Sequence, residues 1–342
     1  MKHELLPESG NFYKANMHMH TNLSDGKMTL EETKKHFMDH GYSIVAFTDH
    51  ETLVPHNDLS DENFLAITSY EIENNSLFPG GYSYQKTYHL NLYAKDKNAT
   101  VSSVFSPDHI WLDHARLLPS EECAKINYPR HYSIASVNDV IRRANEEGFL
   151  VCLNHPVWSL QDLDDYKGIK GLWGIEVYNH GAAVGGYIDT PQPMVEFCRA
   201  GERVFPIAAD DAHSVAHCCG GWINVKAEKL EYETVMTALE KGDFYASNGP
   251  EIKELYMEDN VVHVSCSEAV SIFLVSERRF TRAKRGTYDA PVTEAAFDIT
   301  KYLDETRRAS AHPFRPFFRL EIHDAHGKVA YSRPYFIDEL NG

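Results

Sequence analysis

Two histidines, His18 and His20, stand two positions apart near the start of the chain, and Asp25 follows five residues after the second. Side chains at positions i and i+2 of a strand point to the same side, so these imidazoles could bind one metal ion at a strand end. Residues 14–17 have the pattern of a short strand, and Ser24-Asp25-Gly26 has that of a loop. A lone pair of this kind is weak evidence, because paired histidines are common on exposed strands.

Further histidines and carboxylates follow other apolar runs. The runs end in Asp49-His50, near Glu71, in Asn154-His155-Pro156, at Asn179-His180 and in Asp210-Asp211-Ala212-His213, and His89 lies inside another run. Imidazole and carboxylate groups together suit Zn, Mn or Fe rather than Ca or Mg. The repetition at successive strand ends strengthens the hypothesis of a metal site.

Position alone leaves three assignments open. His89 could be an ordinary strand histidine with a satisfied hydrogen bond. Glu73 competes with Glu71, and the register of the strand decides between them. Asp211 is preferred to its neighbour Asp210 because of its spacing to the histidine that follows.

The elements that must position these groups alternate between apolar strands and helices from residue 14 to about residue 245. Thr29-Leu30-Glu31-Glu32 has the form of a capping box, Ser136 is expected to cap a second helix, and Gly242 to end a third. Strands this apolar, separated by helices, indicate a mostly parallel sheet buried on both faces. About seven such units favour a barrel, in which catalytic groups lie at the carboxyl ends of the strands.

Two regions depart from this alternation. Residues 96–135 form a long insertion with several prolines and aromatic residues, which favours an ordered lid. After residue 250 the strands follow one another without helices between them. We therefore expect an α/β domain over residues 1–250 and a small antiparallel β-sandwich over residues 251–342.

Composition narrows the function classes. The 342 residues carry a net charge of −17, which argues against general affinity for nucleic acid. No apolar run is long enough to span a bilayer, and the first residues lack the apolar core of a signal peptide. Six cysteines without a C-x-x-C pair indicate reduced thiols in a cytoplasmic protein. The 19 histidines are the outlier and point back to metal binding.

In their order, these motifs resemble those of the PHP (polymerase and histidinol phosphatase) family over about the first 250 residues. The matching positions are His18-x-His20 with Asp25, Thr48-Asp49-His50, Glu71, His89, Asn154-His155-Pro156 and Asp211-Ala212-His213. The resemblance implies a distorted (β/α)7 barrel, and the C-terminal part resembles the sandwich of a two-domain branch of that family. Asp210 and Glu51 depart from the family pattern without removing a ligand.

The resemblance also implies two or three divalent ions of Zn, Mn or Fe. One ion would be held by His18, His20, Glu71 and Asp211, a second by Glu71, His89 and His155, and a third by Asp25, His50 and His213. Three divalent ions with three carboxylates leave roughly three positive charges, which would attract a phosphate dianion. A water that bridges two ions becomes hydroxide near neutral pH and is the expected nucleophile.

The main expectation is therefore a metal-dependent phosphoesterase, with Glu71 and Asp211 at the centre of its chemistry. His180 is a candidate general acid. Three residues of the insertion are candidates for binding phosphate: Arg116, Arg130 and His131. Asp49 and Glu176 are candidates for orienting the histidines, and Asp210 could alter the preferred substrate charge.

Other interpretations remain open at this point. The same hydroxide could attack an amide, a carbamate or a carboxylic ester. A nuclease is a further option that the net charge disfavours, and a metal-stabilised binding module is the option without catalysis. The expected partner is a small, phosphorylated molecule, with no membrane.

Overall fold

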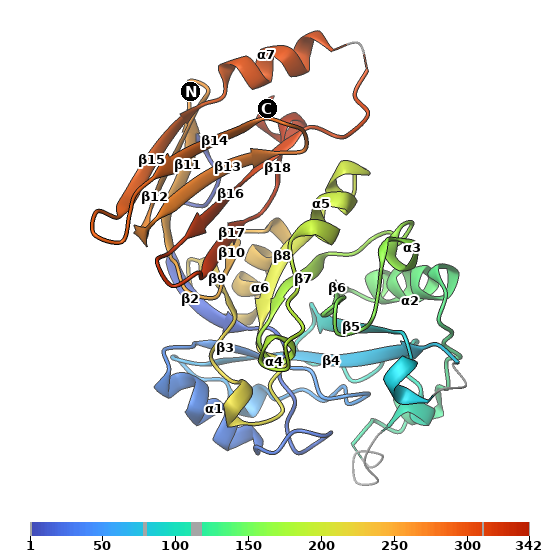
Figure 1. Ribbon diagram of the computed structural model, residues 1–342. Coiled ribbons are helices and arrows are strands. Elements are labelled where there is room, and N and C mark those ends of the chain that lie inside the picture. The colour runs from blue at the N-terminus through green and yellow to red at the C-terminus, as the bar shows by residue number, and fades with distance from the viewer. Residues whose placement is uncertain (1, 78–80, 111–117, 310, 342) are drawn as a thin grey trace.

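Two stacked parts give the protein its shape, with the strands between Asn11 and Ser247 in the lower part and the later strands in the upper part (Figure 1). The computed structural model describes residues 2–77, 81–110, 118–309 and 311–341. Each part has its own apolar core. Within the described ranges, no helix is long and apolar enough to cross a membrane.

The lower part is built on one curved sheet. Its strands are β2 (Asn11–Asn16), β3 (Ile44–Phe47), β4 (Leu65–Asn75), β5 (Thr87–Ala94), β6 (Phe149–Leu153), β7 (Gly174–Asn179), β8 (Phe205–Ala209), β9 (Trp222–Ala227) and β10 (Phe244–Ser247). The spatial order is β10-β9-β2-β3-β4-β5-β6-β7-β8. Strand β8 approaches β9 and β10, but no ladder between these strands closes the sheet among the described residues.

The expectation of a mostly parallel sheet is wrong. The pairs β2–β3, β3–β4, β6–β7 and β7–β8 are parallel, whereas β5 is antiparallel to both of its neighbours and β9 is antiparallel to β2 and β10. The reason is the connection: β4 and β5 follow one another without a helical crossover, which allows the chain only to reverse. The sheet is therefore mixed.

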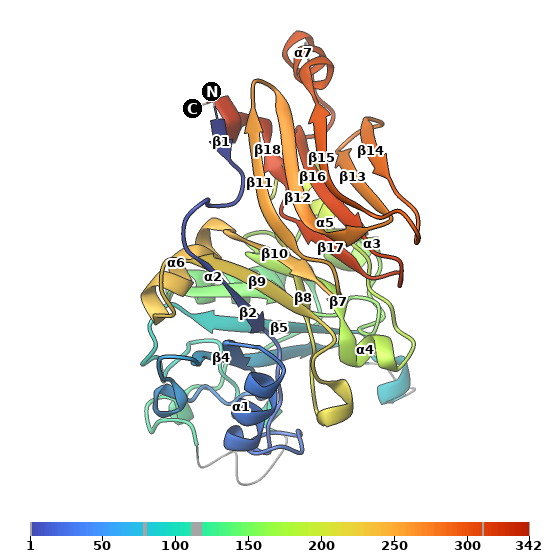
Figure 2. The same cartoon turned by 90° about the vertical axis from the view of Figure 1, so that its left-hand side faces the viewer.

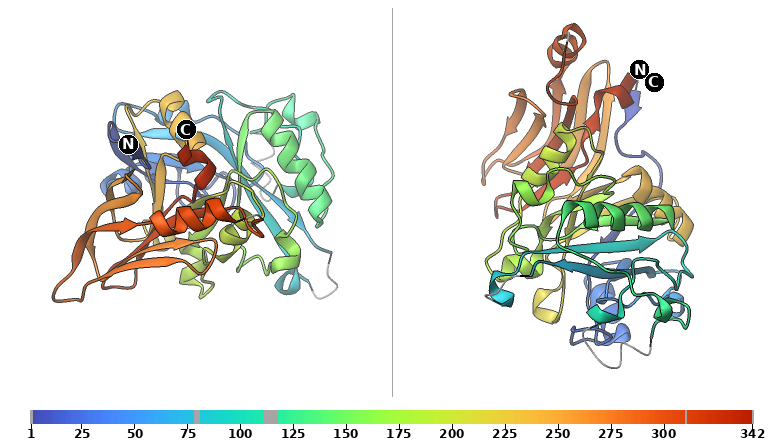
Figure 3. Two further views of the ribbon diagram at one scale, coloured as in Figure 1. Left: turned by 90° about the horizontal axis from the view of Figure 1, so that it is seen from above. Right: turned by 90° about the vertical axis from the view of Figure 1, so that its right-hand side faces the viewer.

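Helices and short 3-10 turns occupy most of the other connections. They are α1 (Leu30–Asp39), α2 (Ile134–Glu146), α3 (Leu163–Tyr166), α4 (His180–Val184), α5 (Gln192–Arg199) and α6 (Tyr232–Lys241), with η1 (Asn57–Leu59), η2 (Tyr82–Tyr84), η3 (Pro107–His109), η5 (Cys123–Lys125) and η6 (Val215–His217). Helix α2 lies along the sheet beside β6, as the right-hand view of Figure 3 shows.

The capping box at Thr29 is confirmed, and Gly242 ends α6 in the left-handed conformation. The cap expected at Ser136 is wrong. Ser133 caps α2 instead, because its hydroxyl accepts the free N–H of Ser136 in the first turn.

The upper part packs two sheets and one helix. One sheet has the order β1-β11-β12-β15, and the strands of the other follow the order β14-β13-β16-β17. Their bounds are β1 (Lys2–Glu4), β11 (Ile252–Glu258), β12 (Val261–Ala269), β13 (Ser271–Ser276), β14 (Thr281–Arg285), β15 (Val292–Asp298), β16 (Phe317–His323), β17 (Val329–Ser332) and β18 (Tyr335–Phe336), with α7 (Thr300–Arg308) and η7 (Ile337–Asn341).

The two parts are joined at both ends of the chain. Strand β17 pairs with β10, so the second sheet continues into the lower one. The N-terminal strand β1 pairs with β11 in the upper part (Figure 2). The antiparallel sandwich is thus present, and the division of the chain at residue 250 stays a prediction.

The insertion over residues 96–135 has a small apolar core of its own. Phe105, Ile110 and Cys123 are buried together, and the ring of Tyr132 stacks on Tyr88 of β5 at 4.4 Å between centroids. These contacts tie the described part of the insertion to the body of the protein.

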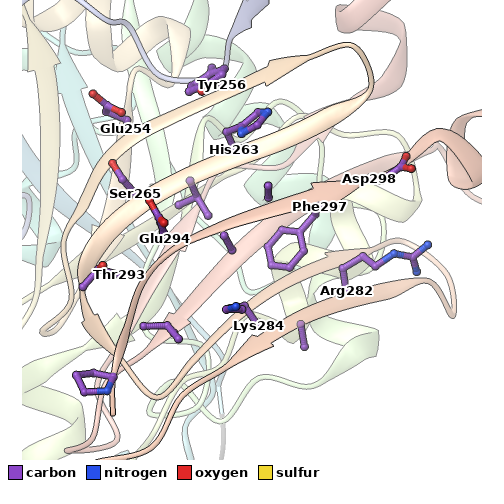
Figure 4. A pocket seen from close by; sticks show the side chains of 16 residues that line it. Glu254, Tyr256, His263, Ser265, Arg282, Lys284, Thr293, Glu294, Phe297 and Asp298 are labelled. Carbon is purple, nitrogen blue, oxygen red and sulfur yellow. The ribbon is translucent and has the colours of Figure 1, made fainter.

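A large hollow of about 890 Å³ lies on the upper part, between the strands β12, β14 and β15 (Figure 4). Its lining mixes carboxylates with Arg282 and Lys284 and includes one histidine, His263, whose ring stacks on Tyr256 at 4.7 Å. This lining brings together no group of metal-binding side chains among the described residues.

We expect the segment that follows the N-terminal strand β1 to contribute to stability, although it lies far from any site. Leu6 is buried in the upper core, and its N–H donates to the carbonyl of Leu255. We expect Leu6→Ala to lower the free energy of unfolding by about 2–5 kcal/mol in urea titrations. Leu77→Ala is the control, because Leu77 is fully exposed. An equal effect of both changes would show that Leu6 does not contribute to the upper core.

Candidate metal centre

The histidines His18 and His20 lie just after β2, at the end of this strand. Met19, between them, turns its side chain into an apolar cluster and its backbone forms a bridge with Ala212. The imidazoles of His18 and His20 therefore point the same way, with their Nε2 atoms 3.1 Å apart. The same-side geometry expected from the spacing is confirmed.

Glu71 is the point at which the histidines meet. Its carboxylate oxygens lie 3.1–3.7 Å from ring nitrogens of five of them: His18, His20, His50, His89 and His155. It lies inside β4 rather than at its end, and Asn154 donates a hydrogen bond to it at 2.7 Å. Because β5 runs backwards, its early residue His89 reaches the same edge of the sheet.

Asp211 forms the second meeting point. One of its oxygens lies 3.2 Å from His18 Nε2 and 3.3 Å from His20 Nε2, and the other lies 3.7 Å from His155 Nε2. Asp211 and His155 have φ angles of 49° and 25°, in a region that residues other than glycine rarely adopt. Strained backbone at two such positions is typical of functional sites.

A third group lies on the outer side of His20. Asp25 has one oxygen 3.5 Å from His20 Nδ1 and the other 3.3 Å from His213 Nε2. The Nε2 atom of His50 lies 3.8 Å from the same carboxylate. The structure thus brings together all the side chains that the family resemblance implies as metal ligands.

Two further carboxylates support these groups. Glu176 accepts hydrogen bonds from His18 Nδ1 and from the backbone N–H of His155, both at 2.8 Å. The carboxylate of Asp49 instead accepts from Thr21 and Ser24, in the loop that carries Asp25. Glu176 therefore orients histidines as expected, whereas Asp49 fixes a loop.

The cluster surrounds a cavity of about 200 Å³. Besides the histidines and carboxylates, its lining includes Trp158, Gly181, Ala182 and His217. The ring of Trp158 lies 4.9 Å from that of His155 and 5.5 Å from that of His89. The cavity therefore has an apolar wall beside a strongly polar floor.

The groups titrate as a strongly coupled set in the absence of metal. Burial alone would lower the pKa of His20 and of His89, but the carboxylates around them raise both pKa values to about 10. Burial lowers the pKa of His50 to about 3. Burial would raise the pKa of Glu71, but the surrounding histidines hold it well below its usual range. The carboxylate of Glu71 is thus ionised, and of the imidazoles near it those of His20 and His89 are protonated while that of His50 is neutral.

These residues fit divalent metal ions. Four groups each place three or four ligand atoms within 4.8 Å of one another: His18, His20 and Glu71; Glu71, His89 and His155; His18, His155 and Asp211; and His20, Asp25, His50 and His213. Mixed imidazole and carboxylate ligands favour Zn, Mn or Fe. Glu71 belongs to two of these groups and Asp211 to one.

Of the residues expected to bind phosphate, the two that the structure describes, Arg130 and His131, do not line the cavity. Arg116 lies outside the described residues. The guanidinium of Arg130 is buried and paired with the equally buried carboxylate of Glu51. His131 is exposed on the insertion and absent from the lining. Glu51, which departs from the family pattern, thus has a structural partner.

His180 and Asp210 also lie apart from the cavity lining. The Nδ1 atom of His180 lies 3.0 Å from the hydroxyl of Tyr178, and its ring packs over Gly220. The carboxylate of Asp210 accepts the backbone N–H groups of residues 219–221. The expectation that Asp210 alters substrate charge is wrong, because this carboxylate holds a loop.

Sequence reasoning missed part of the surroundings. Glu73, first considered as a competitor of Glu71, shares its face of β4 and pairs with His89 at 3.6 Å and with His109 of the insertion at 3.1 Å. The alternation of side chains along a strand could have signalled this pairing. Nothing in the sequence marked Trp158 or His217, because each reaches the cavity from a loop or short turn.

Comparisons with known proteins do not fix the reaction of this chain. No family model and no curated protein matches the sequence. Among solved structures, the chain is similar to a two-domain protein from Bacteroides vulgatus that contains a predicted PHP-like metal-dependent phosphoesterase, with 15% identity and a TM-score of 0.44 over 96% of this chain and 97% of that one.

Two other similar structures carry different chemistries. One is a lesion-specific endonuclease from Pyrococcus furiosus, at 14% identity and a TM-score of 0.41 over 68% of this chain and 56% of that one. The other is an amidohydrolase from Chromobacterium violaceum, at 14% identity and a TM-score of 0.38 over 59% and 88%. Likeness at this level does not choose between reactions, so the choice rests on the geometry of the site.

Glu71 and Glu73 provide a matched pair for testing the centre. We expect Glu71→Gln to abolish metal loading, measured by elemental analysis after dialysis, because five histidines lose their shared anion. Glu73→Gln keeps most of the metal, since Glu73 contacts only His89 among these ligands. Equal loading of both variants would contradict the central role of Glu71.

Metal binding should release protons. His20 and His89 hold protons in the metal-free fold up to pH of about 10, and only neutral imidazole binds metal. Apparent affinity should therefore rise with pH from 7 toward 10. Calorimetry in buffers of different ionisation enthalpy measures the number released, which we expect to be at least one. Binding without proton release would contradict the assigned protonation.

Proposed function

We propose that the protein is a metal-dependent hydrolase of the PHP type that acts on a small phosphate ester. The observation that carries this proposal is the convergence of three carboxylates, Glu71, Asp211 and Asp25, with six histidines around one cavity. Such a site binds several divalent ions at once, and their combined charge attracts a phosphate group.

The carboxylates and histidines of the cluster would hold the ions, and Glu176 and Asn179 would hold these ligands in place. The bound metals would supply Lewis acidity and a nucleophile derived from water. Glu176 accepts from Nδ1 of His18 and so leaves the Nε2 lone pair free for a ligand role. Asn179 donates to Glu176 at 2.8 Å and to Asp211 at 3.2 Å, which fixes both carboxylates.

His217 is a better candidate than His180 for contact with the leaving group. Its side chain lines the cavity, and its Nδ1 atom has no hydrogen-bond partner among the described residues. Burial and the neighbouring His213 lower the pKa of His217. The imidazole is therefore neutral at physiological pH and can exchange a proton with a substrate oxygen.

The surroundings favour a small substrate. A second cavity of about 210 Å³ adjoins the first through His89 and Trp158, and its lining combines Leu160 and Tyr187 with polar side chains such as that of Gln85. Neither lining includes a lysine or an arginine among the described residues. A polyanion such as DNA would therefore have no cationic contacts beyond the metals.

Hydrolysis of an amide, carbamate or carboxylic ester is the second candidate. It is favoured by the same lack of a cationic side chain in the cavity, because Arg130, the described arginine expected to bind phosphate, is occupied by Glu51. The metal centre can serve both reactions.

A substrate panel separates these functions. We expect the metal-loaded protein to hydrolyse p-nitrophenyl phosphate faster than bis-p-nitrophenyl phosphate, an aryl carbamate or single-stranded DNA. Asp211→Asn should abolish turnover, and Glu176→Gln should reduce activity about 10–100-fold, because it only orients ligands. Hydrolysis of the carbamate alone would favour the second candidate, and no turnover with any substrate in the loaded protein would contradict both.

A further inference from the structure

A second set of metal-binding side chains lies outside the candidate centre, on the surface beside α1. His36 stands in the last turn of α1, and His40 follows four residues later as its C-cap. Cys219 comes from the loop after β8, which runs next to α1 in Figure 1. One nitrogen of each imidazole and the Cys219 sulfur lie within 4.8 Å of one another.

The side chains are arranged to converge. Residues four apart on a helix face the same way, and the rings of His36 and His40 are 4.5 Å apart. The Nδ1 atom of His40 lies 2.8 Å from the carbonyl oxygen of His36, to which it donates, so its Nε2 atom faces outward. Cys219 packs against the apolar cluster that includes Phe37, and Phe37 lies on α1 like His36.

We propose that His36, His40 and Cys219 form a second, structural zinc site that ties α1 to the loop after β8. Zinc with bonds of about 2.0–2.1 Å to nitrogen and 2.3 Å to sulfur places tetrahedral ligand atoms about 3.3–3.6 Å apart. The three ligand atoms now lie within 4.8 Å of one another, and small side-chain rotations would bring them to these shorter distances. Three protein ligands leave the fourth position to water.

This donor set differs from that of the candidate centre. A thiolate with two imidazoles suits zinc and other thiophilic ions, whereas the candidate centre combines imidazoles with carboxylates only. Binding requires the thiol proton of Cys219 to leave to solvent as the sulfur–metal bond forms. Burial and the Asp210 carboxylate raise the pKa of this thiol to about 12, so the free protein keeps it protonated.

The surroundings hold the loop in place for such a site. Asp210 accepts the N–H of Cys219 at 2.7 Å, and Cys219 itself has a φ of 66°. The Lys14 ammonium lies over the rings of Tyr42 and Trp222, 4.1 and 3.9 Å from their centroids. The hydrogen bond to Asp210 fixes the loop at Cys219, and the nearby Lys14 ammonium would favour the thiolate form of this residue.

Zinc at this site would also affect the candidate centre, because one segment of the chain carries residues of both. The loop that carries Cys219 begins at Asp211 and His213, which belong to that centre. A zinc ion between α1 and Cys219 would therefore fix the far end of the segment that carries these residues. Zinc should raise the melting temperature through this site independently of turnover.

Cobalt spectroscopy tests the site selectively. The full chain is stripped of metal, kept reduced and titrated with Co²⁺, and the thiolate-to-cobalt charge-transfer absorption in the near ultraviolet is recorded. Because the candidate centre contains no cysteine, its ions give no such band, and the result is independent of the proposed function. We expect one band whose final intensity corresponds to one cobalt–thiolate bond per chain, whatever amount of cobalt the candidate centre takes up.

The adjacent cysteine supplies the matched control. Cys219→Ser should remove the band, while Cys218→Ser should keep it, since the Cys218 thiol already donates to the carbonyl of Ser214. His36→Gln and His40→Gln should each weaken cobalt binding about tenfold or more. Circular dichroism and Cys219→Ala check that loss of the band is not loss of the fold.

The proposal is overturned by any of three results. These are a wild-type protein without the band, a band that survives in Cys219→Ser, or cobalt affinity unchanged in both histidine variants. Loss of the band in Cys218→Ser would also overturn it, because the sulfur ligand would then be the other cysteine.

Discussion

The arrangement depends on one electrostatic constraint: buried carboxylates must be matched by nearby positive charge. Glu71 is only 1% exposed and touches five histidines. An ionised carboxylate without compensation is too costly to bury. Protonated imidazoles compensate it in the metal-free fold, and divalent ions would replace those protons when bound. The same side chains therefore stabilise the fold and create the demand for metal.

The fold brings these buried carboxylates and the histidines together from separate elements. The residues come from the ends of β2, β3, β6 and β8, from inside β4 and from the start of the reversed β5. Loops held by carboxylates fill the gaps, with Asp49 fixing the loop of Asp25 and Asp210 fixing residues 219–221. These contacts set the positions of groups that are distant in sequence, and β1 and β17 join the second part to this frame.

The sequence predicted that these histidines and carboxylates would lie close together, because strand ends and i, i+2 spacing are local properties that survive folding, and their role as metal ligands stays a prediction. Apolar strands with helices between them also predicted the α/β class and the later sandwich. The sequence did not predict the reversal of β5, since strand direction depends on the connection and not on strand composition. It also misassigned Arg130, whose burial against Glu51 is a long-range contact, and it gave no signal for Trp158. Side chains whose role comes from a partner far along the chain are those that pattern alone does not find.

Anomalous diffraction from crystals of the protein loaded with manganese or zinc tests the central claim most directly. The account predicts two or three ions around the cavity, with Glu71 among their ligands. Their other ligands should be the imidazoles that now lie within 3.8 Å of the carboxylates of Glu71 and Asp25. A crystal with metal in excess and no anomalous peak at Glu71, with the carboxylate still paired to protonated histidines, would contradict it.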